Sequence, residues 1–564
     1  MRLSNRPTGS SARPWRRLLI GVSAAGAALT PMVPAALGAS AAPPAAATVA
    51  WSPCYQWLAV EQSADSPVRY ECAQVPVPLD HDRPNGASIQ IAMVRIPASD
   101  PQNRIGSLFL NPGGPGGSGI DFTIFAGPFL YTEEVRARFD FVGFDPRGIG
   151  RSTQLRCAGS NRQIGAWFTA VVWPETTEEI ADWAAADAAM QSDCDQKGGR
   201  ILDHMSTADV ARDLDLLRAA VGDEQLSYAG YSYGSFLGTT YANLFPSRVR
   251  AVVVDGVLDP IDWTTGDPGQ EDEPFSTRLR SDIGARDTLN EFFRLCDEAA
   301  DTCAFSAPGG TAARYDALES LLRAEPIDFD GFLYDHRVLI GDSLGALYDS
   351  PSWSSFAEYL AFIESQASGA EPVTATTFQS KRRSVGSGRG GFPVYFGVEA
   401  FAGVACGDSD NPDSLAAWAA AAGEREQESR FGPLWTWISS ICSAWPGAGD
   451  DRYTGPFTAD TANPVLVAST RFDPATPLHG ADRVADLLPN SRQLIVEGWG
   501  HTTLFLSAAA DEAVSAYLLD GTLPPEGAVF EQDVDPMAGP AEGQASAALR
   551  AKYLAALLGE RSAR

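Results

Sequence analysis

The chain has 564 residues and a formal net charge of −29 at pH 7, with 42 lysines and arginines against 71 aspartates and glutamates. So acidic a composition excludes nucleic acid and anionic membrane surfaces as expected partners. The length is sufficient for a large hydrophobic core and more than one domain.

The N-terminus has the features of an export signal. Arginines up to Arg17 precede the apolar stretch 18–29, and small residues near Ala41 offer a cleavage site. The adjacent arginines Arg16 and Arg17 permit twin-arginine as well as Sec export. The apolar stretch is too short for a retained anchor. We therefore expect residues 1–41 to be a signal peptide, and the mature protein to be secreted or associated with the cell envelope, without stable membrane insertion.

Two buried strands are predicted early in the chain, each followed by a loop with unusual composition. Residues 107–110 form the first and lead into the glycine-rich sequence 111–117. Residues 139–144 form the second and lead into the loop 145–152, which we interpret as structural support near a site. Glycines let a backbone approach a substrate and direct N–H groups at a developing negative charge. We expect the N–H of Gly114 to serve as one such donor.

The sequence Gly-Tyr-Ser-Tyr-Gly at 230–234 is the most informative motif. It matches G-x-S-x-G, in which a strand turns sharply into a helix and exposes a serine hydroxyl. The flanking patterns predict, in order, a helix over 207–221, a strand over 225–229, a helix over 235–244 and a buried strand over 248–257. This context is the one that an α/β-hydrolase requires. We therefore expect Ser232 to be a nucleophile and the N–H of Tyr233 to be the second oxyanion donor.

A second match to the same pattern surrounds Ser343, but its context differs. Pro351 cuts off any following helix, and the neighbouring Asp342 would disfavour an oxyanion. We interpret Ser343 as a chance match in a helix or turn.

The acid and the base of such a site follow the nucleophile in chain order. Residues 464–469 predict a buried strand, and Asp473 lies just past its end. Residues 493–496 predict the last strand, followed by Gly-Trp-Gly-His, which ends at His501. Both residues lie on loops at carboxyl ends of strands, where open α/β sheets place their sites.

Two alternatives to this pair are weaker. His479 is too close in sequence to Asp473 to be oriented by it, and Asp482 falls on a predicted helix. We therefore predict acyl-enzyme chemistry at Ser232, with His501 as the base and Asp473 orienting it. The chemistry needs no metal, and we expect no cofactor.

The predicted core is divided into two parts of unequal length by a large insertion. The predicted fold class is α/β, an α/β-hydrolase with a large, mainly helical cap inserted before the last two core strands. The expected parts are the first part of the core (42–258), the cap (259–462), the second part of the core (463–540) and a C-terminal helical tail (541–564). A stretch rich in glycine, serine and arginine, 380–391, is predicted to be a mobile loop.

Eight cysteines, an even number, fit an exported chain with disulfides. Eight cysteines allow 105 pairings, so the sequence does not fix the connectivity. The absence of a C-x-x-C unit argues against metal or redox roles. We expect sequence neighbours to pair: Cys54 with Cys72, Cys157 with Cys194, Cys296 with Cys303, and Cys406 with Cys442.

These motifs together resemble a known family, the secreted actinobacterial tripeptidyl aminopeptidases, which are serine peptidases related to prolyl aminopeptidases. The resemblance rests on five motifs and the large cap: Pro-Gly-Gly-Pro-Gly (112–116), Asp-Pro-Arg-Gly-x-Gly-x-Ser (145–152), Gly-Tyr-Ser-Tyr-Gly (230–234), Asp-x-x-Thr-Pro (473–477) and Gly-x-Gly-His (498–501). The chain departs from prolyl aminopeptidases at Pro112, where those enzymes have histidine.

The resemblance implies peptide substrates and release of short peptides, tripeptides above all, from free N-termini. An exopeptidase of this kind must bind an ammonium group, and a carboxylate in the cap is the physical means. The expected candidates are Asp408, which follows Cys406, and Glu271 and Glu273 in an acidic stretch. An esterase with the same triad and a non-catalytic binding protein of hydrolase shape are the alternative functions.

Overall fold

The computed structural model describes residues 49–56, 61–63, 66–371, 373–384, 397–449 and 451–538. The predicted signal peptide (1–41) and the predicted tail helix (541–564) lie outside these residues. The chain divides into two units, Met1–Ala45 and Ala46–Arg564.

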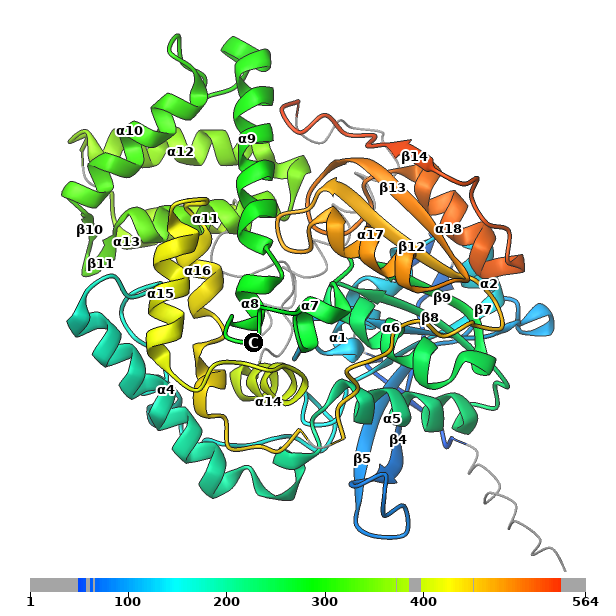
Figure 1. The fold of residues 1–564 in the computed structure, drawn as a ribbon. Helices are drawn as coiled ribbons and strands as arrows, with labels where there is room; N and C mark the ends of the chain where they lie inside the picture. The colour runs from blue at the N-terminus through cyan, green and yellow to red at the C-terminus, as the bar shows by residue number, and fades with distance from the viewer. Residues whose placement is uncertain are drawn as a thin grey trace, which may run out of the picture. The chain divides into compact units, whose positions relative to one another are not determined.

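A ten-stranded sheet runs through the second unit in the order β1-β4-β5-β7-β6-β8-β9-β12-β13-β14 (Figure 1). Its strands are β1 (Ser52–Cys54), β4 (Tyr70–Pro78), β5 (Ser88–Ile96), β6 (Gly106–Asn111), β7 (Phe139–Phe144), β8 (Leu226–Tyr231), β9 (Val249–Asp255), β12 (Val465–Phe472), β13 (Ser491–Trp499) and β14 (Ala528–Glu531). All pairs from β7 to β14 are parallel, and the first three pairs are antiparallel. The predicted α/β class is confirmed.

The prediction that 493–496 is the last strand is wrong, because β14 pairs with β13 beyond it. Only four residues long and half-exposed along its length, β14 has neither the apolar run nor the length that identifies a core strand from sequence.

Helices cover both faces of the sheet and bury two hydrophobic clusters. Successive side chains of a strand point to opposite faces. Accordingly Phe109 of β6 belongs to one cluster, and its neighbours Leu108 and Leu110 belong to the other. The first cluster includes α5 (Thr207–Ala220), α6 (Tyr233–Leu244) and α17 (Leu478–Leu487), and the second includes α1 (Gly119–Phe125), α2 (Glu133–Arg138) and α18 (Ala508–Asp520).

The segment between β9 and β12 is mainly helical and has a hydrophobic cluster of its own, with Trp353, Trp418 and Trp437 fully buried in it. Its elements are α7 (Pro260–Thr264), α8 (Phe275–Arg278), α9 (Ser281–Ala299), α10 (Thr311–Ala324), β10 (Ile327–Phe329), β11 (Phe332–Tyr334), α11 (His336–Leu347), α12 (Trp353–Ala367), α13 (Ala375–Ser384), α14 (Val398–Asp408), α15 (Leu415–Glu426) and α16 (Gly432–Trp437). Figure 1 shows this segment in green to yellow. The boundaries proposed for core and cap stay predictions.

The loop predicted at 380–391 is helical in its first part, because α13 continues to Ser384. Phe378 of this helix stacks on Phe329 with 4.0 Å between the ring centroids, and Arg382 forms an ion pair with Asp342. These tertiary contacts outweigh a local composition that is typical of a loop. Residues 385–391 lie outside the described residues.

A further helical segment lies between β7 and α5, in a stretch that we assigned to the first part of the core. Its main element is α4 (Thr177–Lys197), which packs on the inserted segment. Trp183 donates a 2.8 Å hydrogen bond to Ser440, and Gln191 donates one of 3.0 Å to the carbonyl of Ile441. The segment between β7 and α5 therefore packs against the segment between β9 and β12.

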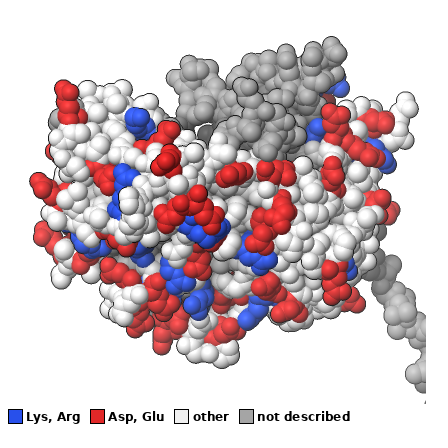
Figure 2. Space-filling model, turned by 90° about the horizontal axis from the view of Figure 1, so that it is seen from above, with Lys and Arg blue, Asp and Glu red and all other residues white. Residues whose placement is uncertain are grey.

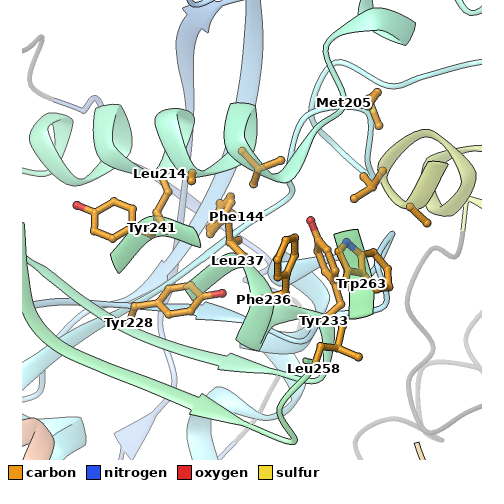
Figure 3. Close-up of a cluster of buried hydrophobic side chains, with 14 of the residues drawn as sticks. Phe144, Met205, Leu214, Tyr228, Tyr233, Phe236, Leu237, Tyr241, Leu258 and Trp263 are labelled. Atoms are coloured by element: carbon orange, nitrogen blue, oxygen red, sulfur yellow. The ribbon is translucent and has the colours of Figure 1, made fainter. Parts of the chain in front are cut away.

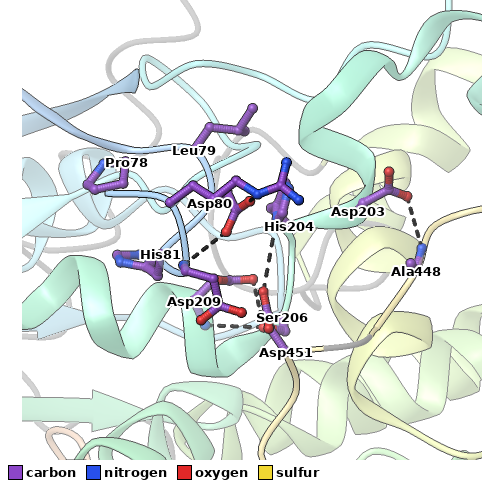
Figure 4. A network of polar contacts seen from close by, with 12 residues as sticks. Pro78, Leu79, Asp80, His81, Asp203, His204, Ser206, Asp209, Ala448 and Asp451 are labelled. Atoms are coloured by element: carbon purple, nitrogen blue, oxygen red, sulfur yellow. Dashed lines mark hydrogen bonds and ion pairs between the residues drawn. The ribbon is translucent and has the colours of Figure 1, made fainter. Parts of the chain in front are cut away.

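The loop after β7 is built around a buried arginine, as its interpretation as structural support implies. Arg147 has no exposed side-chain surface and forms a two-point ion pair with Asp213, at 2.7 Å from Nε and 2.7 Å from Nη2. Its guanidinium also donates to the carbonyl oxygens of Leu79, Pro78 and His204. Figure 4 labels the three residues whose carbonyl oxygens accept these bonds, Pro78, Leu79 and His204.

Acidic side chains are widespread on the face shown in Figure 2, with lysines and arginines among them, in accord with the net charge of −29. Within the described ranges, the chain has no helix that is both long enough and apolar enough to cross a membrane.

The predicted disulfide pairing is confirmed, and every cysteine takes part in a bridge. The four bonds join Cys54 to Cys72, Cys157 to Cys194, Cys296 to Cys303, and Cys406 to Cys442.

We expect the Cys157–Cys194 bridge to stabilise the fold more than the Cys296–Cys303 bridge. The first closes a loop of 37 residues and the second a loop of 7. A longer loop loses more conformational entropy when it is closed in the unfolded chain, which predicts about 4 and about 2 kcal/mol, respectively. Denaturant unfolding of the two double alanine variants measures both values. An equal loss in the two variants would contradict the prediction.

Candidate active site

Ser232 lies at a strained turn between β8 and α6. Its backbone has φ 58° and ψ −128°, a conformation that is rare for a residue with a side chain. The Ser232 N–H donates a 2.8 Å hydrogen bond to the carbonyl of Asp255, at the end of β9. A Cβ at Gly230 would lie 2.2 Å from the Gly234 oxygen, and a Cβ at Gly234 would lie 2.7 Å from the Asn111 oxygen. Both positions therefore require glycine, as the motif predicts.

Ser343 has different surroundings. It lies inside α11, where its Oγ donates a 2.7 Å hydrogen bond to the carbonyl of Leu339 and lies 2.8 Å from the hydroxyl of Tyr315. The side chain is fully buried. The interpretation of this second motif as part of a helix is confirmed.

Asp473 and His501 come together from the loops after β12 and β13. The imidazole Nδ1 of His501 lies 2.9 and 3.0 Å from the two carboxylate oxygens of Asp473. The carboxylate is buried and also accepts hydrogen bonds from the N–H groups of Ala475, Thr476 and Thr502. These donors hold Asp473 in place, so its orientation fixes that of the imidazole.

The two alternatives make other contacts. His479 lies at the start of α17, with its Nε2 3.8 Å from Asp262, and Asp482 accepts a 2.7 Å hydrogen bond from Gln493.

Asp255 connects the serine with the histidine loop, although its sequence context gave no reason to single it out. Its carbonyl accepts from Ser232, and its carboxylate accepts from the N–H of Thr503 at 2.9 Å and from the Thr503 hydroxyl at 2.8 Å. Because Thr503 is two residues after His501, Asp255 is hydrogen-bonded both to Ser232 and to the loop that carries His501. Burial, with a smaller contribution from the charge of Asp473, raises the pKa of Asp255 to about 7.

The inserted segment also contacts the histidine. Tyr348, directly after α11, accepts a 3.1 Å hydrogen bond from the backbone N–H of His501. Its ring packs edge-on against the imidazole, with 4.9 Å between the centroids. In α9, a Cβ at Gly284 would lie 2.6 Å from the Asp473 carbonyl oxygen. The inserted segment therefore packs directly on both loops.

The glycine-rich loop after β6 lies against the turn at Ser232. A Cβ at Gly113 would lie 2.3 Å from the Tyr231 oxygen and 2.8 Å from the Tyr233 nitrogen. Tyr233 is the first residue of α6, so its N–H has no partner within the helix. Gly114 lines the same cavity as Ser232. The assignment of Gly114 and Tyr233 as oxyanion donors stays a prediction.

Ser232 opens onto a cavity of about 610 Å³, within the range of about 300–1,000 Å³ that is usual for ligand pockets. The loop at Gly114, the helix α4, the segment between β9 and β12, and Ala475 and Thr476 all contribute to its walls. Most of the lining is aromatic or aliphatic. Figure 3 shows Trp263 beside Tyr233 and Phe236, and the centroids of Trp263 and Phe275 are 4.8 Å apart.

The three carboxylates proposed to bind a substrate amino group do not line this cavity. Asp408 is buried and accepts from the Thr207 N–H at 2.8 Å and from Trp263 Nε1 at 3.2 Å. Burial raises its pKa to about 6. Glu271 is exposed and accepts from the N–H of Gly269, and Glu273 is partly exposed.

The described acid that does line the cavity is Asp187 on α4. Sequence reasoning missed it, because α4 carries several acids at similar spacing and only the tertiary packing distinguishes one of them.

Among the residues that the structure describes, two other groups of side chains have their ligating atoms within 4.8 Å of one another, close enough to hold a metal ion. They are Asp80, His204 and Asp451, and Asp259, Asp262 and His479. Neither group lines the cavity at Ser232.

Comparison with known proteins gives a consistent assignment. Models of the TAP-like protein family and of the alpha/beta hydrolase fold match residues 427–530 and 106–284, respectively. Serine protease Hip1 of Mycobacterium tuberculosis is 30% identical over 500 residues, which cover 85% of this chain and 90% of that protein.

Two further relatives are similar over most of their length. Tripeptidyl aminopeptidase of Streptomyces coelicolor is 29% identical over 495 residues, 86% of this chain and 86% of that protein. Carboxylesterase B of Mycobacterium tuberculosis is 32% identical over 507 residues, 86% of this chain and 90% of that protein. With the α/β-hydrolase fold thus confirmed, the chain belongs to the TAP-like family of serine hydrolases and peptidases, together with tripeptidyl aminopeptidase and serine protease Hip1.

Proposed function

We propose that this protein is an exported serine exopeptidase that releases short peptides, tripeptides above all, from free N-termini. The observation that carries the proposal is the arrangement around Asp255. This residue ties the strained Ser232 to the loop of His501, whose imidazole is oriented by Asp473, beside an apolar cavity. Relatives that are named tripeptidyl aminopeptidase and serine protease support the substrate class, and four disulfides support export.

In the proposed reaction each of these side chains has a separate role. Asp473 accepts the Nδ1 proton of His501, so Nε2 is the nitrogen left to take a proton from Ser232. The serine oxygen then attacks the peptide carbonyl, and the N–H groups of Gly114 and Tyr233 are proposed to stabilise the oxyanion. His501 returns the proton to the leaving amine. A water molecule, deprotonated by His501, then hydrolyses the acyl-enzyme and restores the serine.

An esterase is the second candidate function, and two observations favour it. The cavity lining is largely apolar, and a relative with 32% identity is named carboxylesterase B. Both reactions proceed through an acyl-enzyme formed by the same triad. The fold and the triad therefore do not determine which substrate is used.

A substrate panel distinguishes the two functions. We expect tripeptide p-nitroanilides with a free N-terminus to be hydrolysed, with the intact tripeptide as the product, because a bound amino terminus sets the distance to the scissile bond. We expect their N-acetylated forms to lose most of their kcat/KM. Chromogenic assays alongside p-nitrophenyl esters, with mass spectrometry of the products, measure this. Equal turnover of free and acetylated peptides would refute the exopeptidase proposal, and turnover of esters alone would favour the esterase.

A further inference from the structure

The cavity at Ser232 contains one carboxylate. Among the described residues that line it, Asp187 is the single acid, and none is a lysine, an arginine or a histidine. Asp187 reaches the cavity from α4, where Trp183, Ala186 and Met190 line the same cavity at the i−4, i−1 and i+3 positions. The remaining lining is aromatic, aliphatic or small and polar. The carboxylate is therefore the one ionised partner that the cavity offers to a charged ligand.

A chain of two hydrogen bonds orients this carboxylate. The indole N–H of Trp183, which is only a donor, donates to Ser440 Oγ at 2.8 Å. The hydroxyl of Ser440 then donates to Oδ2 of Asp187 at 2.7 Å. No donor among the residues that the structure describes hydrogen-bonds to Oδ1. One oxygen is thus fixed by the protein, and the other is left to accept from a ligand.

Asp187 has no cationic partner among the described side chains. Burial raises its pKa to about 6, since little opposes the loss of solvation besides the hydrogen bond from Ser440. Asp187 is half-buried, and a carboxylate that has lost part of its solvation is stabilised when a charged group completes the site. Aromatic faces attract cations, and five tryptophans line the same cavity: Trp167, Trp183, Trp263, Trp435 and Trp437. The chemistry of the lining therefore matches an organic ammonium group.

We propose that Asp187 binds the free α-ammonium group of the peptide substrate. This inference rests on the proposed function, and it replaces Asp408, Glu271 and Glu273, which lie outside the cavity, as the candidate carboxylate. With the amino terminus held at α4 and the reacting carbonyl at Ser232, the span between them limits how many residues are released. Asp187 is then a specificity-determining residue that contacts substrate at a distance from the reacting atoms.

Asp187→Asn tests the assignment, because the amide keeps the shape of the side chain and an acceptor for Ser440 but removes the charge. We expect kcat/KM for a free tripeptide p-nitroanilide, divided by that for p-nitrophenyl acetate, to fall by about 30-fold or more, as for truncation of one partner of a buried charge pair. The ester reports on Ser232 and His501, so the ratio isolates amine recognition. Asp182→Asn, on the exposed face of α4, is the matched control and should leave the ratio as in the wild type.

The outcomes separate this inference from the proposed function. If the wild type discriminates against acetylated peptides and Asp187→Asn keeps the wild-type ratio, another group binds the amine and the assignment to Asp187 is overturned. If the wild type treats free and acetylated peptides alike, the exopeptidase proposal itself fails, and the assignment fails with it. A fall in the ratio for the free amine, with no change for the acetylated peptide, supports both.

The pH dependence of the same ratio is a second measurement that needs no variant to fold. The kcat/KM of each substrate reports the free enzyme, in which burial raises the pKa of Asp187 to about 6. The α-amino group of the substrate, with a pKa of about 8, is protonated throughout the range from 5 to 7. The carboxylate is ionised above its pKa and neutral below it. The ratio should therefore fall as the pH drops through about 6. A ratio that stays constant down to the usual aspartate pKa of about 4 would overturn the assignment.

Discussion

Replacement of Ser232 by alanine should abolish turnover of every substrate and leave the fold intact. The hydroxyl is the atom that forms the acyl-enzyme, and loss of the nucleophile in a comparable triad lowers kcat by about 10⁶-fold. The change removes only the hydroxyl and keeps the Cβ, so it adds no volume at this strained position with positive φ. Chromogenic peptide and ester assays measure the loss, and covalent labelling with a fluorophosphonate measures the nucleophile directly.

Ser343→Ala is the matched control for this experiment. Ser343 lies in the second G-x-S-x-G sequence, but its hydroxyl is engaged by Leu339 and Tyr315 inside α11. We expect this variant to be labelled and to turn over substrate as the wild type does. A well-folded but inactive Ser343→Ala protein would show that Ser343, and not Ser232, is the nucleophile. Residual turnover in Ser232→Ala would also point to another nucleophile.

Replacement of Arg147 by alanine should lower the free energy of unfolding by about 3–5 kcal/mol, the typical loss when one member of a buried ion pair is removed. The guanidinium has no exposed surface, pairs with Asp213 through two hydrogen bonds and satisfies three backbone carbonyls. Without it, the Asp213 carboxylate is left buried among polar groups that have lost their donor. Urea unfolding followed by circular dichroism measures the loss.

The control is Arg83, whose side chain is 81% exposed and lies 3.5 Å from Asp80. Such a surface pair contributes between about 0 and 1 kcal/mol, so Arg83→Ala should unfold nearly as the wild type does. If the two arginine variants lose similar free energies of unfolding, the burial and ion pairing of Arg147 do not stabilise the fold as predicted.

The elements that sequence analysis found are those whose signals are local. The helix at 207–220 begins at Ser206, whose hydroxyl caps it, and β7 coincides with the predicted 139–144. The turn at Ser232 could be predicted because its two glycines meet backbone atoms only a few residues away or on the next strand. The cysteine pairs were also predictable, since each bridge joins sequence neighbours.

What sequence analysis missed depends on contacts between distant segments. The partner of Asp408 is one example: its carboxylate accepts from the first N–H of α5, at Thr207, where helix N-termini favour anions, and the neighbouring cysteine gives no sign of this contact. Asp187 is one of several acids on α4, and only the packing of that helix on Ser440 brings it to the cavity. Asp255 ends an apolar strand, and nothing in its local sequence indicates that it joins the serine to the histidine loop.

The contacts of Tyr348 and Gly284 have a consequence for protein engineering. In many hydrolases, exchanging the inserted segment between relatives is an attractive way to graft one specificity onto another scaffold. Here a carbonyl and a ring from Tyr348 support His501, and α9 approaches Asp473 so closely at Gly284 that even a methyl group would not fit. In a chimaera that exchanges only the inserted helices, His501 would lose the contacts that position it. The unit to transplant comprises the inserted helices with the loops after β12 and β13.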